Sequence, residues 1–272
     1  MTTEVLASST KMITPLIIRS LTIGIITSVL CAIIGVYVVI RKMAFFAHAV
    51  SHASLTGVAI AYLANWNPFL TAIGFGVLVG VFVSFLIEKS KLIVDTIIGI
   101  ILPFSMSIGL ILLSFVKGYR PDVMSYLFGD ILSTSKADII LVLVFAVPIF
   151  ILIAVFNKQF LMISLDRDFA EIRGYQVNAL DYVFMILVSL VVLLSTKIVG
   201  IILVSALVVI PSATAVNIAK DIKQTFVFSF IISIVGVIIG ILLSYIFNLP
   251  TGPLIVSVIS IIFLVSLLFK EK

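Results

Sequence analysis

Nine long apolar segments run through this chain, and they restrict it to one broad class of fold. A helix needs about 20 apolar residues to cross about 30 Å of hydrocarbon, and hydrocarbon cannot satisfy a loose backbone, so spanning segments are helical by default. The alternating pattern of a membrane barrel is not seen. The segments, bounded by charges, proline or asparagine, cover residues 14–40, 44–64, 68–87, 92–116, 136–156, 179–195, 198–219, 225–247 and 254–269. The sequence therefore predicts an all-α polytopic membrane protein of about eight or nine transmembrane helices, folded as one domain over residues 1–272.

The scarcity of charge supports this class. Hydrophobic residues make up 62% of the chain and charged residues 11%, whereas a soluble domain is about one quarter charged. That excludes an ordinary soluble enzyme, a nucleic-acid binder and a disordered chain. The net charge of +5 comes from cations spread as ones and twos, which is not the clustered basic patch of a nucleic-acid binder. The single Cys31 excludes an intrachain disulfide and a cysteine metal cage.

The distribution of Lys and Arg predicts the orientation in the membrane. Of the 17 cations, six fall on one face and eleven on the other, and the richer face is cytoplasmic by the positive-inside rule. This places the N-terminus outside and the C-terminus inside. The cations of the cytoplasmic face are Arg41, Lys42, Lys89, Lys91, Lys158, Arg167, Arg173, Lys220, Lys223, Lys270 and Lys272.

The longest polar stretch is predicted to be a cytoplasmic loop over 157–178. Inside it, LDRDFAEIRG has the signals of a short helix over 166–174. Asp166 is its expected N-cap, Asp168 lies in the first turn, Arg173 in the last, and Gly174 follows at the left-handed C′ position. The segment is where a cytoplasmic partner could bind; the alternative is a surface helix without a role.

The only two histidines lie together at the start of the second segment. His48 and His52 are four residues apart, so on a helix they stack on one face, which is the spacing by which a helix presents two imidazoles to one metal ion. Thr56 continues their ridge, and a neighbouring ridge of Ala49, Ala53, Gly57 and Ala61 lets another helix approach closely. Because polar groups within a membrane are costly, we interpret the pair as a metal or proton site. The alternative is two histidines hydrogen-bonded between helices.

Asp95 is the next candidate ligand. It lies about one turn above the Lys89 and Lys91 end of the fourth segment, at a depth that overlaps the histidines. A carboxylate with two neutral imidazoles suits a divalent transition metal such as Zn²⁺ or Mn²⁺. Alternatively, Asp95 caps the helix near the membrane interface.

Weaker features concern packing and access. Pro211 is expected to break the seventh segment near its inner end. The GxxxG pairs Gly76/Gly80 and Gly236/Gly240 indicate helix packing or a dimer face.

The segment 117–135, which contains Asp130, suits an interfacial segment at the outer mouth. No GxxxxGK[ST] phosphate loop is present, so the energy for any transport would come from another protein. The chain itself is not expected to be an enzyme.

Several sequence blocks, in order along nearly the whole chain, resemble the permease subunits of bacterial ABC importers for zinc, manganese or iron. The blocks are RKMAFFAHAVSHASLTGVAIAYL, VDTIIGI, MSYLFGDIL, LDRDFAEIRG, KIVGIILVSALVVIPSATA and NLPTGP. The resemblance implies a fold similar to cobalamin and siderophore importer permeases, in the bacterial cytoplasmic membrane. It also implies a homodimer, two cytoplasmic ATPase subunits that bind the ATP, an external metal-loaded solute-binding protein, and no permanently bound cofactor.

The resemblance assigns roles to particular residues. His52 matches the family's intramembrane metal site most directly. His48 and Asp95 remain candidate ligands from their positions in the sequence, and Ser51, Thr56, Asp130 and Pro211 are candidates for the pathway or gate. The helix over 166–174 would be the coupling helix that binds the ATPase, through Asp166, Asp168, Ala170, Glu171, Arg173 and Gly174.

One position departs from the family pattern. The family usually has a pattern similar to G-D-A-x-S-H at this place. This chain has His48 at the position of the aspartate. Exchange of a hard oxygen ligand for imidazole shifts the preference towards Zn²⁺ and away from Mn²⁺. We therefore predict an ATP-driven importer of divalent transition metal, zinc favoured over manganese or iron, working by alternating access at a dimer interface. The alternatives are an ion-gradient-driven metal or proton carrier without an ATPase, and a membrane scaffold that transports nothing.

Overall fold

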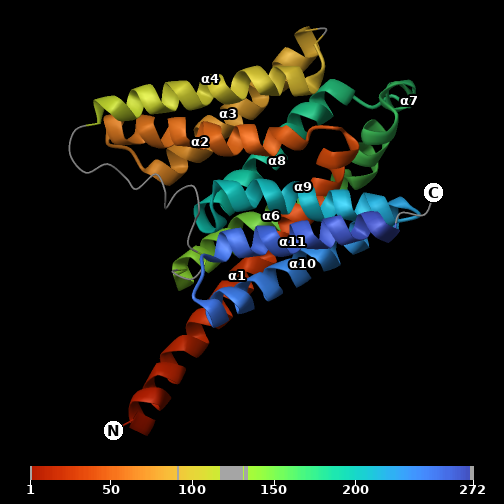
Figure 1. Cartoon of the computed structure of the whole chain (residues 1–272). Helices are drawn as coiled ribbons and strands as arrows, with labels where there is room; N and C mark the ends of the chain where they lie inside the picture. The colour runs from red at the N-terminus through yellow and green to blue at the C-terminus, as the bar shows by residue number, and fades with distance from the viewer. Residues whose placement is uncertain (1, 91, 117–130, 132–133, 270–272) are drawn as a thin grey trace.

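The protein is a bundle of long helices. A computed structural model describes residues 2–90, 92–116, 131 and 134–269, which are mostly helical and contain no strand (Figure 1). The helices are α1 (Thr2–Ile40), α2 (Ala44–Ala64), α3 (Pro68–Lys89), α4 (Val94–Phe115), α6 (Lys136–Leu165), α7 (Arg167–Ile172), α8 (Val177–Val199), α9 (Ile201–Ile218), α10 (Ile222–Phe247) and α11 (Thr251–Ser266), with a last 3-10 turn η2 (Leu267–Phe269).

Eight of the described helices are long and apolar enough to cross a membrane. They are α1 from Ile17 onward, α2, α3, α4, α6, α8, α9 and α10. The ninth apolar segment is α11, a shorter helix of 16 residues. The predicted all-α, multi-span fold class is confirmed, with the eight or nine apolar helices that the hydropathy pattern indicated.

Most predicted boundaries agree within three residues, and the exceptions are at α1, α6 and α8. The first helix begins at Thr2 instead of residue 14. The helix predicted to end at 156 continues as α6 to Leu165, because Phe160 and Ile163 of the extension are buried in the protein. The loop predicted over 157–178 was therefore too long: only 166–176, with α7 inside it, separates α6 from α8.

The junction near Lys197 was also misplaced. α8 continues through Lys197, and the chain turns only at Gly200, whose φ of +86° suits a residue without a Cβ. The helix tolerates the lysine because its Nζ lies 2.8 Å from Asp138 Oδ1 of α6 and 4.7 Å from the centre of the Phe69 ring. The predicted short sixth segment is thus a 23-residue helix.

The helices alternate in direction, so that one end of the bundle collects the connections 41–43, 90–93, 166–176 and 219–221. We call this the α7 end; α7 and the C-terminus lie there, at the right of Figure 1. Within the most apolar stretch of each helix, about two thirds or more of the residues are buried in α1, α2 and α8 (67–72%), against 22–33% in α3, α4, α6 and α10. The helix that carries both histidines is therefore among the innermost.

An aromatic cluster fills the core near the α7 end. Tyr37 of α1 packs edge-on against Phe160, Phe184 and Phe226, with ring centres 5.3–6.1 Å apart. Its hydroxyl donates a 2.6 Å hydrogen bond to Asn157 Oδ1 of α6. A buried tyrosine that has both ring neighbours and a hydroxyl partner fixes α1 against α6, α8 and α10.

Glycines allow the helix backbones to touch. A Cβ on Gly57 of α2 would lie 2.7 Å from Ala72 Cα of α3, which confirms the close approach predicted for the small-residue ridge. Both GxxxG pairs pack inside the chain: Gly76 and Gly80 against α8, and Gly236 and Gly240 against Ile259 and Ile255 of α11. The packing alternative for these motifs is the one that the fold uses.

Pro211 does not break its helix, contrary to the prediction. It lies buried inside the continuous α9. A proline removes one backbone donor, and hydroxyls of neighbouring helices hold the segment in place. Ser212 lies 3.0 Å from Ser229 Oγ of α10, and both serines donate to the carbonyl of Ala32 in α1, at 3.4 and 3.3 Å.

Gly240→Ala tests the close packing of α10 on α11. The added Cβ would lie 2.7 Å from Ile255 Cα, a backbone atom that cannot rotate away. We expect the free energy of unfolding to fall by about 1–3 kcal/mol, as for an overpacked core. The measurement is the midpoint of thermal unfolding in detergent, which should be lower. Gly74→Ala is the matched control, because a Cβ there meets nothing within 4 Å. Equal midpoints for the two variants would contradict the packing described.

Candidate functional site

The two histidines lie against each other on α2, as their spacing predicted. Their ring centres are 4.4 Å apart and the ring planes are inclined by 70°. His48 Nδ1 lies 3.3 Å from Ser205 Oγ of α9, so the pair faces the contact between α2 and α9. The alternative of histidines bonded between helices holds for His48 alone.

His52 is the residue that the fold leaves unsatisfied. Its side chain is buried, with 9% of the residue exposed, and its Nδ1 has no hydrogen-bond partner. Most buried polar atoms in folded proteins have a partner, because an orphaned one costs about 1–3 kcal/mol. A ring nitrogen left free beside a second imidazole is suited to transient binding of a cation.

The hydroxyls of Thr56 and Ser51 near the histidines are hydrogen-bonded to helix carbonyls. Thr56 Oγ1 donates a 2.6 Å bond to the carbonyl of Ser105, and a Cβ on Gly109 would meet the same threonine, so Thr56 joins α2 to α4. Ser51 donates to the carbonyl of Ala47 in its own helix. Thr56 therefore has a packing role, whereas the hydroxyl of Ser51 is bonded within α2.

The structure does not bring Asp95 to the histidines. Asp95 is exposed in the first turn of α4, and no group of three or more His, Cys, Asp or Glu in the described ranges could hold a metal ion. It is not the N-cap either, since that position belongs to Ile93. Within the described residues, the nitrogen donors at this place are two imidazoles, fewer than the four ligands of a closed zinc site. Asp130 falls outside the described residues, and Pro211 lies within α9.

The short helix α7 forms where the capping signals predicted. The side chain of Asp166 caps it by accepting a 2.9 Å bond from the Phe169 amide, and Gly174 adopts a φ of +82° just after it. Asp168 lies in the first turn, as predicted. Arg173 is the C-cap, one residue beyond the last turn where it was expected, and its guanidinium lies 5.0 Å from the Phe169 ring centre.

α7 is held by one apolar contact and presents others outward. Ala170 is fully buried in a small cluster with Ile163 and Val177. Ile172 is 83% exposed and Phe169 is 43% exposed. Large apolar side chains that face water on a charged connection are unusual unless a partner covers them. They therefore indicate a binding surface.

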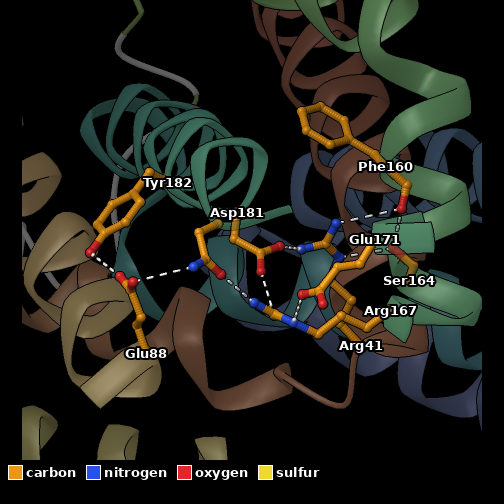
Figure 2. A network of polar contacts seen from close by, with 9 residues as sticks. Arg41, Glu88, Phe160, Ser164, Arg167, Glu171, Asp181 and Tyr182 are labelled. Carbon is orange, nitrogen blue, oxygen red and sulfur yellow. Dashed lines mark hydrogen bonds and ion pairs between the residues drawn. The ribbon is translucent and has the colours of Figure 1, made fainter. Parts of the chain in front are cut away.

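A polar network that the sequence analysis did not predict lies beside α7 (Figure 2). One carboxylate oxygen of Asp181 in α8 accepts a 2.7 Å hydrogen bond from Arg41 Nη1. The other accepts a 2.6 Å bond from Arg167 Nη1. Burial lowers the pKa of the Arg41 guanidinium and Asp181 raises it again; an arginine stays protonated in either case. The network lines a cavity of about 540 Å³ at the α7 end.

The residues of this network gave only partial signals. Arg41 and Arg167 counted as cytoplasmic cations, but Asp181 lies 140 residues from Arg41 in the sequence. No spacing rule links positions so far apart. An acidic residue in the first two turns of a predicted membrane helix is the one signal that could have singled it out.

The chain is similar in sequence to membrane subunits of metal transport systems. The chain is 37% identical to the manganese transport system membrane protein MntC of Listeria monocytogenes over 94% of this chain and 90% of that protein. It is 29% identical to the high-affinity zinc uptake system membrane protein ZnuB of Haemophilus influenzae over 92% and 95%.

Solved structures agree. The fold matches PsaBC from Streptococcus pneumoniae, solved in complex with Fab, with a TM-score of 0.80, 31% identity and coverage of 91% of this chain and 89% of that one. An inward-facing metal-chelate type ABC transporter matches at a TM-score of 0.76 and 15% identity, over 93% and 85%, which shows the likeness of fold alone. The ABC 3 transport family matches residues 13–270. With nearly the whole chain matched, this multi-pass membrane protein belongs to the ABC 3 transport family.

Proposed function

We propose that this chain is the permease subunit of an ATP-driven importer of a divalent transition metal, and that His48 and His52 bind the ion on its way through. The observation that carries the proposal is the buried His52 with an unpartnered Nδ1, 4.4 Å from the second imidazole, on one of the most buried helices. Relatives named for manganese transport and for zinc uptake support the class of substrate. Membership of an ABC family favours an ATPase partner over the gradient-driven alternative.

The proposed metal is zinc before manganese or iron. Named relatives transport either metal, so the argument comes from ligand chemistry. Two imidazoles and no carboxylate within the described part of the site suit a borderline-soft ion, whereas manganese prefers oxygen ligands. His48 occupies the place of the expected aspartate, which makes it the residue that sets this preference.

The proposed assembly has two permease copies, a pair of cytoplasmic ATPase subunits and an external solute-binding protein. The α7 end is assigned to the cytoplasm, because most of the described Lys and Arg residues lie in its connections or in the helix ends that adjoin them. That places the N-terminus outside and the C-terminus inside. Alternating access between the two copies would then move the ion from the external vestibule past the histidines.

α7 is the proposed contact with the ATPase. The outward Ile172 and Phe169, together with Asp168, Glu171 and Arg173, give an apolar centre with a charged rim, which is the common composition of a protein interface. Asp166 and Gly174 shape the ends of the helix, and Ala170 fixes its inner face.

His52→Ala should abolish most metal uptake. Removal of the unpartnered imidazole takes away one of two ligands, and a loss of about 1.4 kcal/mol in binding free energy already raises the dissociation constant about tenfold. Uptake of radioactive zinc would be measured in cells that carry the complete transporter. Ser257→Ala, which removes an exposed hydroxyl on α11, is the control for handling and expression. Normal uptake by a well-expressed His52→Ala protein would refute the site.

His48→Asp should change the choice of metal more than the rate. A carboxylate restores an oxygen ligand, so we expect the zinc-to-manganese uptake ratio to fall by about tenfold, or about 1.4 kcal/mol in relative binding. The ratio is read by competition of the two ions in one uptake assay. An unchanged ratio would show that residue 48 does not select the metal.

Ile172→Asp should release the ATPase. A carboxylate at the centre of the apolar surface must be desolvated on binding, so the ATPase should no longer co-purify with the tagged permease. Ile93→Asp is a matched control at the same end of the bundle, since Ile93 is 76% exposed and lies outside the helices. Equal retention of the ATPase by both variants would rule out α7 as the contact.

A further inference from the structure

One carboxylate at the α7 end joins two parts of the chain that lie far apart in sequence. Each oxygen of Asp181 takes a different arginine: Oδ1 is 2.7 Å from Arg41 and Oδ2 is 2.6 Å from Arg167 (Figure 2). The side chains of Arg41 and Asp181 are only 8% and 14% exposed. Hydrogen bonds between charged groups are short and directional, so this arrangement fixes both arginines relative to α8.

Arg41 anchors the start of the histidine helix. It lies between α1 and α2, seven residues before His48. Besides Asp181, its guanidinium donates to Ser164 Oγ at 2.8 Å and to the Phe160 carbonyl at 3.4 Å, and it lies 4.0 Å above the centre of the Phe184 ring. The base of α2 is therefore held to α6 and α8 through one side chain.

Arg167 is the first residue of α7 and makes the other half of the connection. Its second amino group donates to Asn178 Oδ1 of α8 at 2.7 Å. Asn178 in turn donates to Glu88 near the end of α3 at 3.2 Å, and Tyr182 donates to the same carboxylate at 3.0 Å. Besides chain continuity and the Ala170 contact, the bonds of Arg167 to Asp181 and Asn178 of α8 hold α7 in place.

We propose that Asp181 is a positioning residue that transmits displacement of α7 to α2, and so to the histidine pair, through its shared contacts with Arg167 and Arg41. The proposal rests on the function proposed above. The path has two polar steps, Arg167 to Asp181 and Asp181 to Arg41, followed by the short connection 42–43 into α2. A buried ion pair contributes little net stability because of its desolvation cost, so its value here lies in fixing geometry.

The connection predicts that hydrolysis and transport can be separated. The experiment uses the complete complex in liposomes, with the metal-loaded binding protein and zinc as the ion, and measures zinc transported per ATP hydrolysed. Arg167→Ala removes the α7 half of the connection and leaves the buried Arg41–Asp181 pair intact. We expect the ATPase to stay bound and active, and zinc per ATP to fall by about threefold to about thirtyfold, the range seen for residues that modulate coupling.

Asp181→Asn tests the centre of the connection. Asp181 lies outside α7 and its side chain is only 14% exposed, so a similar loss with the ATPase still bound would argue against a direct effect on the ATPase contact. The double variant Arg167→Ala with Asp181→Asn should be no worse than the worse single variant, because residues that act through one contact are not additive. Arg167→Lys keeps the charge and should restore part of the ratio. Lys223→Ala, which removes an exposed cation of α10 at the same end, should match the wild type.

The outcomes separate the two proposals. An unchanged zinc-to-ATP ratio in Arg167→Ala, with a transporting wild type, overturns the connection and leaves the function in place. Additive losses in the double variant also overturn it. Absence of zinc transport by the wild-type complex overturns the proposed function, and the connection with it.

Discussion

Direct contact between helix backbones is the constraint on which this structure depends. Lipid is as apolar as leucine, so the hydrophobic effect does not drive membrane helices together, and packing must do so. Gly57 meets Ala72 across α2 and α3, Gly35 of α1 meets the Val208 carbonyl of α9, and Gly240 meets Ile255 across α10 and α11. These approaches surround the inner helices and leave little room beside them. Polar side chains on those helices are therefore bonded within their own helix, bonded to a neighbouring helix, or left without a partner.

Several buried hydroxyls in the described residues bond to a neighbouring helix, and others bond within their own helix. The hydroxyls of Ser212, Ser229 and Thr56 all bond across helices. On the inner helices His52 Nδ1 and Ser189 Oγ are exceptions, because each is buried without a hydrogen-bond partner. Of the two residues, His52 has a second imidazole close to it, and this marks His52 as the candidate ligand.

Features determined by neighbouring residues could be predicted from the sequence. The spans follow from runs of apolar residues, the histidine pair from a four-residue spacing, and α7 from Asp166 and Gly174 at its two ends. Where the prediction was wrong, a distant contact decided the outcome. α6 continues past residue 156 because Phe160 packs on Tyr37, and Lys197 stays in α8 because Asp138 pairs with it. Asp95 was expected near the histidines from its depth, but depth does not determine which side of a helix a residue faces. The Asp181 network joins residues 140 positions apart and has no local pattern.

The length of α6 has a mechanical consequence. Its 30 residues form a rod of about 45 Å, and even at a tilt of about 20° it covers about 42 Å along the membrane normal. The hydrocarbon layer takes up about 30 Å of that. The remaining length of about 12 Å is comparable to the headgroup layers, which bring a bilayer to about 40–45 Å, so α6 carries α7 to the level where lipid meets water. Pro148 lies inside α6 and removes one backbone hydrogen bond from it, so the helix that carries α7 has a point at which it can bend.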